Sequence, residues 1–182
     1  TTSRGTMGAE TPAMAEAARE TPGAMAAILG LEDSIVEELC SEIEGVWPAN
    51  YNCPGQVVVS GENEAVEKLI AEATERGARK AVKLRVSGGF HSPLVARAAE
   101  RLRPALAKVP WRDPGTPYMS TVSARIEDAQ RIAGLLAEQL TAPVRFTQAV
   151  RGLVKDGLET FVEIGPGQVL GGLLKGCVRS LR

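Results

Sequence analysis

The chain contains one histidine, His91, which lies in the run Val86-Ser87-Gly88-Gly89-Phe90-His91-Ser92. Imidazole is the side chain whose ordinary pKa lies nearest neutrality, so a histidine can accept a proton and return it during a reaction at neutral pH. A lone histidine is also compatible with an ordinary packed side chain. The proton-transfer hypothesis therefore depends on which other polar residues accompany it.

Three further segments combine polar side chains with turn-forming residues. They are the runs Pro48-Ala49-Asn50-Tyr51-Asn52-Cys53-Pro54-Gly55-Gln56, Glu138-Gln139-Leu140-Thr141-Ala142-Pro143-Val144 and Glu163-Ile164-Gly165-Pro166-Gly167. Turn chemistry alone also explains the first run, since Asn, Pro and Gly dominate turns. The glycines of the third run favour either a tight turn before a helix or a cradle for an anion at the start of that helix.

In this order and at these spacings, the four segments resemble those of malonyl-CoA:acyl-carrier-protein transacylases, the acyltransferases that load fatty-acid and polyketide synthesis. The resemblance runs from about residue 23 to the C-terminus. It implies malonyl transfer from coenzyme A to the phosphopantetheine thiol of an acyl carrier protein through a serine acyl-enzyme. Malonyl-CoA and the carrier protein would be the partners, with no cofactor. The alternative is a non-catalytic module that binds a carrier protein or another protein.

The resemblance also assigns roles to individual residues. It makes His91 the general base that takes the proton of the serine and later acts as general acid. A backbone carbonyl at the position of Gln139 would fix the imidazole tautomer, in place of the carboxylate of a Ser-His-Asp triad. Asn52 would touch the substrate or its thioester arm, and Phe90 would line the acyl pocket. Spacing alone favours a solvent-facing Gln139, and a purely core role is the alternative for Phe90.

The serine nucleophile itself is not found in this sequence. No G-x-S-x-G occurs in the 182 residues, and neither does the early Gln-Gly segment with which the family completes its oxyanion hole. A serine nucleophile needs that sharp turn to present its hydroxyl and to supply backbone N–H groups to the oxyanion. We therefore expect this chain alone to be inactive unless the N-terminal half of the acyltransferase core is supplied.

Recognition of the malonyl carboxylate calls for a fixed guanidinium group. The family takes it from an Arg-Gly pair, and Arg4-Gly5 has the right residue types but lies too early in the chain. Matching Met14-Ala15-Glu16-Ala17 to the family instead places Glu10 at the arginine position. Arg4 is therefore a doubtful candidate for the substrate clamp, because the second match leaves a glutamate, which cannot bind a carboxylate, at that position.

A basic cluster is a candidate for docking an acyl carrier protein, because such carriers are strongly acidic. Its members are Arg76, Arg79, Lys80 and Lys83, with Arg85 nearby. An ordinary solvated face is the alternative explanation. Aromatic residues make up 4% of the chain and none lies among these cations, which argues against nucleic-acid binding.

Composition indicates a cytoplasmic globular protein. Apolar residues make up 44% of the chain, and the net charge of −1 gives no general attraction to nucleic acid or anionic membrane. No apolar run approaches the ~18 to 20 residues that span a bilayer, and the N-terminus lacks a signal-peptide pattern. Three cysteines without a CxxC pair fit a reducing compartment and argue against a structural zinc site.

The elements predicted for residues 23–87 follow the order βαββαβ, which is typical of a ferredoxin-like subdomain. Strands are expected at residues 24–31, 46–50, 56–60 and 82–86, and helices start at Asp33-Ser34 and at Asn63. Ser34 and Glu37 form a candidate capping box, and Gly77 is expected to end the second helix.

Residues 88–182 are predicted to alternate helix and strand. Helices are expected from Ser92-Pro93 toward Lys108 with a kink at Pro104, and at residues 128–140, 146–156 and 169–181. Strands are expected at residues 118–122 and 160–164. Two strands are too few for a complete layer, so the resemblance implies the C-terminal part of an α/β-hydrolase-like core. The fold class is therefore α/β with an α+β insert, and residues 1–22 are either partly vector-derived or the end of a core helix.

Overall fold

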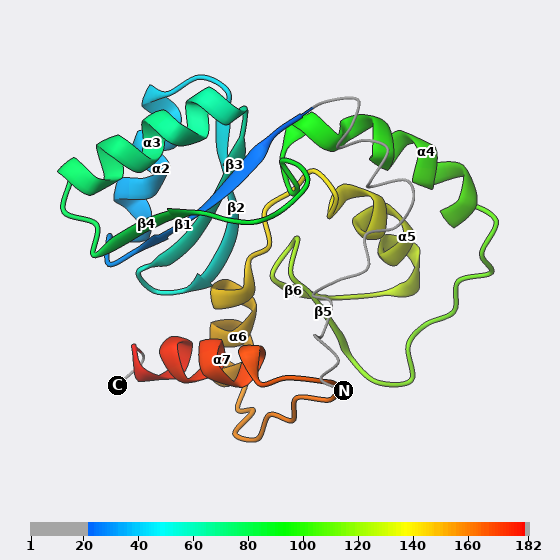
Figure 1. Cartoon of the computed structure of the whole chain (residues 1–182). Coiled ribbons are helices and arrows are strands. Elements are labelled where there is room, and N and C mark those ends of the chain that lie inside the picture. Colours follow the sequence, from blue (N-terminus) through cyan, green and yellow to red (C-terminus); the bar gives the residue numbers. More distant parts are fainter. Residues whose placement is uncertain (1–21, 181–182) are drawn as a thin grey trace, which may run out of the picture.

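The computed structural model describes residues 22–180. These contain a four-stranded sheet with helices α2 and α3, and Figure 1 shows this first group beside a second group of helices and short strands. The first group contains β1 (Ala24–Leu29), α2 (Asp33–Glu42), β2 (Val46–Cys53), β3 (Gln56–Gly61), α3 (Asn63–Glu75) and β4 (Lys80–Lys83). The second contains η1 (Pro93–Val95), α4 (Ala96–Leu106), β5 (Tyr118–Ser120), β6 (Arg125–Glu127), α5 (Ala129–Glu138), α6 (Phe146–Lys155) and α7 (Val169–Arg179).

The sheet has the strand order β2-β3-β1-β4, and every pairing in it is antiparallel. A βαββαβ chain produces this order when both of its helices cross the same face of the sheet. The hairpin between β2 and β3 turns at Gly55, whose φ of 74° suits glycine. The predicted α/β class with a ferredoxin-like unit is therefore confirmed.

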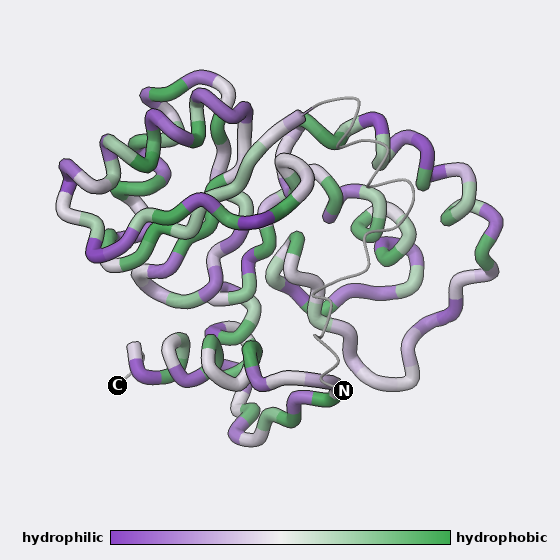
Figure 2. The backbone as a smooth tube through the Cα atoms, in the orientation of Figure 1, coloured by the Kyte–Doolittle hydropathy of each residue, from purple (hydrophilic) through white to green (hydrophobic). Residues whose placement is uncertain are grey.

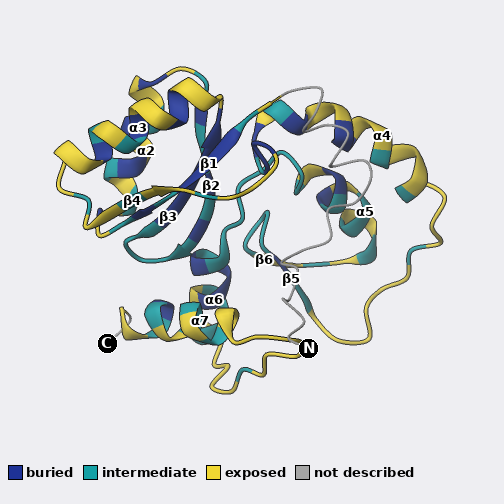
Figure 3. Cartoon of the chain, viewed as in Figure 1, coloured by how far each residue is buried: buried dark blue, intermediate teal, exposed yellow. Residues whose placement is uncertain are grey.

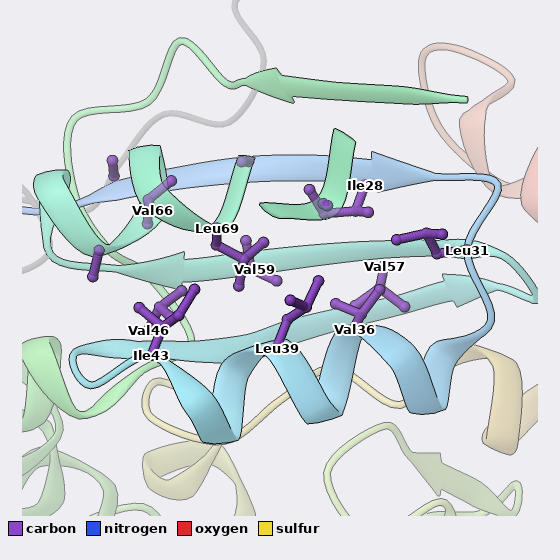
Figure 4. Packing of buried hydrophobic residues seen from close by; sticks show 14 of the residues in the cluster. Ile28, Leu31, Val36, Leu39, Ile43, Val46, Val57, Val59, Val66 and Leu69 are labelled. Carbon is purple, nitrogen blue, oxygen red and sulfur yellow. The ribbon is translucent and has the colours of Figure 1, made fainter. Parts of the chain in front are cut away.

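Helices α2 and α3 cover one face of the sheet with apolar side chains spaced three and four residues apart. Leu39 and Leu69 are fully buried there, and Figure 4 shows them with Val36 and Val66 between the helices and the strands. Ala26 and Ile28 of β1 complete this core from the sheet side. It is the main core of the first group.

The other face of β1 is covered as well. Met25 packs with Phe90, Val95 and Ala98 in a second buried cluster, so the segment that leads into α4 closes this side. Because β1 is buried on both faces, its sequence is continuously apolar rather than alternating. Phe90 is thus held by the sheet, one residue before His91.

The predicted helix caps differ from those in the structure. Helix α2 begins at Asp33 with Glu32 at the N-cap position and no side-chain cap, so the Ser34–Glu37 capping box is wrong. The carboxylate of Asp33 instead accepts a hydrogen bond from the Gly55 N–H at 3.2 Å, which ties the start of α2 to the β2–β3 turn. Asn63 likewise lies inside α3 and does not cap it.

The strand expected at residues 160–164 does not form. Val162 and Ile164 are 77% and 92% exposed, and no strand in residues 22–180 lies beside them to supply ladder hydrogen bonds. Figure 3 colours most of the connection between α6 and α7 as exposed, and Figure 2 shows apolar stretches along it. The structure has instead a hairpin of β5 and β6, and the sequence analysis missed β6.

The helices of the second group begin close to their predicted positions. Ser92 caps η1 and Asp128 caps α5, each through its own side chain. Pro104 lies inside the last turn of α4, and that helix ends at Leu106. None of the helices in the described part of the chain combines the length and apolar composition needed to cross a membrane.

Candidate functional site around His91

His91 lies in the linker between β4 and α4, drawn in green in Figure 1, and has an unusual backbone conformation. Its φ is 57°, in the left-handed region, which costs a residue with a Cβ about 1–2 kcal/mol. Strain of this kind persists only where the surrounding structure enforces it. The turn at His91 is therefore held by its neighbours.

The imidazole is oriented by one hydrogen bond across 48 residues of sequence. Nδ1 of His91 lies 2.8 Å from the backbone carbonyl oxygen of Gln139, the C-cap residue of α5. A carbonyl oxygen can only accept, so Nδ1–H donates. When the ring is neutral, its unprotonated nitrogen is then Nε2, which can take a proton. The structure places the acceptor where the resemblance implied it, whereas the catalytic roles of both residues stay predictions.

Two recesses meet at His91. One, of about 320 Å³, is lined by Asn50, Asn52 and Phe90 together with apolar side chains of β1, β3 and the linker. The other, of about 310 Å³, is lined by Trp47, Pro48, Tyr51, His91, Pro93, Thr141, Pro143 and Arg145. The predicted substrate residues thus share the first recess with the imidazole.

The strand that carries Asn52 is bound to the segment that follows Gln139. Val144 forms a parallel bridge with Asn50 of β2: the Val144 N–H donates to the Ala49 carbonyl and the Tyr51 N–H donates to the Val144 carbonyl, both at 2.8 Å. The acceptor of the imidazole and the asparagine-bearing strand therefore belong to one hydrogen-bonded unit. The sequence analysis made no prediction for Val144, because nothing local in the sequence identifies β2 as its partner.

Two side chains from the C-terminal helices donate hydrogen bonds to backbone carbonyls of β2. The Thr147 hydroxyl donates to the Tyr51 carbonyl at 3.1 Å, and the Cys177 thiol donates to the Asn52 carbonyl at 3.5 Å. Both side chains are buried, and the strand register shifts between Tyr51 and Cys53 at this point. Helices α6 and α7 thus hold the backbone of Asn52, a role that the sequence analysis missed.

Arg145 is a further residue at the site that the sequence analysis missed. Its guanidinium carbon lies 5.8 Å from the centre of the Tyr51 ring, at one wall of the second recess. The Tyr51 hydroxyl donates to a carboxylate oxygen of Glu37 at 2.7 Å. Burial and this bond raise the pKa of Tyr51, so the phenol remains protonated and serves as a fixed wall.

The cysteines are poor candidates for a nucleophile. All three are unpaired, and burial raises the pKa of the thiols of Cys53 and Cys177 and that of Cys40 to about 12. A raised pKa leaves little thiolate, which is the reactive form. Within residues 22–180, no cluster of three metal-ligating side chains is present either.

The glycine-rich run at residues 163–167 forms a turn that places Glu163 at the start of α7. The carboxylate of Glu163 accepts hydrogen bonds from the backbone N–H groups of Leu170 at 3.1 Å and Gly171 at 2.9 Å. The anion at this helix start is therefore the chain's own side chain. Gly165 and Gly167, at φ values of 139° and 103°, allow the turn that brings Glu163 back.

Half of the basic cluster is paired with acidic neighbours. The Arg76 guanidinium nitrogens lie 3.2 Å from a carboxylate oxygen of Glu38 and 3.1 Å from one of Glu42. The Lys83 ammonium nitrogen lies 2.7 Å from a carboxylate oxygen of Glu67. Arg79 and Lys80 are exposed. A role in docking a carrier protein stays a prediction for these four residues, and the pairings make Arg79 and Lys80 its stronger members. The candidate clamp Arg4 and the alternative position Glu10 lie outside the described residues.

Comparison with known proteins adds independent findings. Residues 12–181 match the family model described as an acyl transferase domain. The chain is 43% identical over 174 residues to a malonyl CoA-acyl carrier protein transacylase of Bacillus subtilis, covering 93% of the chain and 55% of that protein. A transacylase of the same description from Staphylococcus aureus is 37% identical, with 93% and 56% covered.

Solved structures give the same result. A malonyl-CoA:acyl carrier protein transacylase from Xanthomonas oryzae superposes with a TM-score of 0.85 at 42% identity, covering 91% of this chain and 55% of that one. A complex of a type II PKS acyl-carrier protein with its malonyl-transacylase gives 0.85 at 37% identity, with 90% and 56% covered. The chain thus spans about half the length of the relatives it matches.

Proposed function

The chain belongs to the acyl transferase domain family, and from this premise we propose that it serves malonyl transfer from coenzyme A to the phosphopantetheine thiol of an acyl carrier protein. The proposal extends to this chain what its relatives' names state, namely malonyl-CoA and an acyl carrier protein as substrates. The observation that carries it is the 2.8 Å hydrogen bond between His91 Nδ1 and the Gln139 carbonyl, which leaves Nε2 able to act as a base.

In the proposed reaction His91 moves one proton in each half. Nε2 takes the proton of a serine hydroxyl as the serine oxygen attacks the thioester carbonyl, and the resulting imidazolium returns it to the departing coenzyme A sulfur. In the second half the carrier thiol gives its proton to Nε2 while its sulfur attacks the acyl-serine, and the serine oxygen leaves with that proton. The Gln139 carbonyl stabilises the imidazolium by accepting from Nδ1–H throughout.

We propose that the serine comes from outside these 182 residues, because no G-x-S-x-G occurs among them. We propose that the N-terminal half of an acyltransferase core supplies it, and that the present chain alone is inactive. The proposed transfer uses malonyl-CoA and the carrier protein as substrates and needs no cofactor. A cytoplasmic location stays a prediction from the composition and from three cysteines without a CxxC pair.

Radiolabelled malonyl-CoA and a holo acyl carrier protein provide the direct test. We expect no transfer of label to the carrier by this chain alone, and transfer once a polypeptide carrying the serine turn is joined to it or mixed with it. Transfer by the chain alone would show that the nucleophile lies within it. No transfer by the joined protein would contradict the proposed activity.

The alternative of a non-catalytic binding module explains less of the structure. Such a module could use the exposed Arg79 and Lys80 to bind an acidic partner. It would have no need for a histidine held in a strained turn with one tautomer selected by Gln139. The enzyme hypothesis accounts for both features.

Phe90 is the residue for which we predict an effect on acyl choice. Its side chain packs against the sheet with Met25 and Val58 and lines the recess that also contains Asn52 and His91. A branched methylmalonyl group would overlap the ring unless the wall were repacked. In a complete enzyme, Phe90→Ser should narrow the preference for malonyl over methylmalonyl by roughly 10-fold or more, since one methyl group is worth about 1–3 kcal/mol in a pocket.

Competition of the two thioesters, scored as the ratio of their kcat/KM values, measures this effect. Phe90→Leu is the matched control, because it keeps most of the apolar volume and should retain most of the preference. An unchanged ratio in Phe90→Ser would mean that Phe90 is only a packed core residue.

A further inference from the structure

We propose that Ser92 is a positioning residue for His91. Its buried hydroxyl fixes the left-handed turn from which the imidazole reaches the Gln139 carbonyl. The effect on catalysis rests on the function proposed above, whereas the effect on the imidazole does not.

The hydroxyl of Ser92 joins the chain before His91 to the chain after it. Ser92 has no exposed surface, and its Oγ donates to the Gly89 carbonyl at 2.6 Å. The same oxygen accepts from the Leu94 N–H at 3.4 Å, at the start of η1. The short first bond closes a loop around Phe90 and His91, which is more than the cap of a helix requires.

Gly89 gives this loop a fixed point of attachment. A Cβ at Gly89 would lie 2.9 Å from the Leu94 side chain and 3.3 Å from the Gly61 carbonyl, and a Cβ at Gly23 would lie 2.8 Å from the Gly89 nitrogen. The backbone at Gly89 therefore packs directly on the end of the β1–β3 pair. Through Ser92, this end of the sheet holds the turn that presents His91.

The backbone conformation of His91 explains why the turn needs the hydrogen bond from Ser92 to Gly89. A φ of 57° is unfavourable for a residue with a Cβ, so a free linker would spend most of its time in other conformations. Those conformations turn the ring away from Gln139, because the 2.8 Å contact depends on the direction of the Cα–Cβ bond. Loss of the Ser92 hydroxyl should therefore weaken the hydrogen bond between the imidazole and the Gln139 carbonyl.

The single histidine makes the test direct, because its two ring nitrogens give one pair of ¹⁵N signals in the full chain. In the wild-type protein with a neutral ring, we expect the widely separated shifts of one Nδ1–H tautomer. In Ser92→Ala we expect this separation to collapse toward the average of two exchanging tautomers, while the amide signals of β1 and β3 stay in place.

Ser60→Ala is the matched control. Ser60 is also fully buried and borders Gly89, but its hydroxyl has no hydrogen-bond partner within the described residues. Its removal should leave the ¹⁵N separation unchanged. A Ser92→Ala protein with the wild-type separation would overturn the proposal.

A second variant covers the case in which Ser92→Ala does not fold. Ser92→Cys keeps nearly the same shape with a much weaker donor, so it should reduce the ¹⁵N separation, and an unchanged separation in this variant would also overturn the proposal. In a complete enzyme, Ser92→Ala should lower kcat on the order of 10-fold to 100-fold with little change in KM. A collapsed ¹⁵N separation with an unchanged kcat would support the positioning by Ser92 and overturn the catalytic role of His91.

Discussion

Replacing His91 with alanine in a complete enzyme should lower malonyl transfer by about 10²- to 10⁴-fold, the usual contribution of a positioned general base. The imidazole is the group at this site that can take a proton at neutral pH, and its Nε2 is left free by the bond from Nδ1–H to Gln139. The measurement is single-turnover acylation, followed as radiolabelled malonyl group bound to the protein. It isolates the step in which the serine proton is removed.

His91→Asn separates loss of the base from disturbance of the turn. Asparagine tolerates the left-handed conformation that His91 adopts at φ 57°, so the backbone should be retained while the base is lost. Gln139→Ala keeps the backbone carbonyl that accepts from Nδ1–H and should therefore cost far less than His91→Ala. A wild-type rate in His91→Ala would remove this residue from the mechanism.

Leu39→Ala should destabilise the sheet and its helices by about 2–5 kcal/mol, the usual cost of a cavity at a fully buried leucine. Leu39 has no exposed surface and packs between α2 and the sheet (Figure 4). The cost of opening that region can be measured from hydrogen exchange of the most protected amides in β1 and β3.

Leu170→Ala is the control for this prediction. Leu170 is 50% exposed at the start of α7, so its truncation should change stability by about 0.5 kcal/mol or less. Equal losses in the two variants would mean that the core between α2, α3 and the sheet does not carry the stability of this group.

The sequence by itself determined the order of the first group of elements, although β4 spans Lys80–Lys83 and not the predicted residues 82–86. Apolar residues at spacings of three and four marked the faces of α2 and α3 that meet the sheet, and the continuous apolar run of β1 matched a strand buried on both sides. These are local patterns, because each residue's face follows from the period of its own helix or strand. The α/β class and the ferredoxin-like unit therefore followed from the sequence.

The sequence was a weaker guide to features that depend on a contact with another segment of the chain. Residues 160–164 have the composition of a strand, but a strand forms only where a neighbour supplies hydrogen bonds, and Val162 and Ile164 are exposed instead. The Ser34–Glu37 pair has the pattern of a capping box, yet Asp33 starts the helix and binds the turn at Gly55. Local composition could not reveal either outcome.

For the site, the sequence supplied the residue types, and the resemblance supplied the pairing of His91 with Gln139. Only the tertiary structure decided how they are held. It showed the left-handed backbone of His91, the bond of Ser92 to Gly89 and the thiol of Cys177 on the carbonyl of Asn52. It also showed Arg76 and Lys83 paired with carboxylates, which a count of charges does not reveal. Except for the Ser92–Gly89 bond, these contacts join residues far apart in the chain, and helix or strand periodicity carries no information about which distant residues meet.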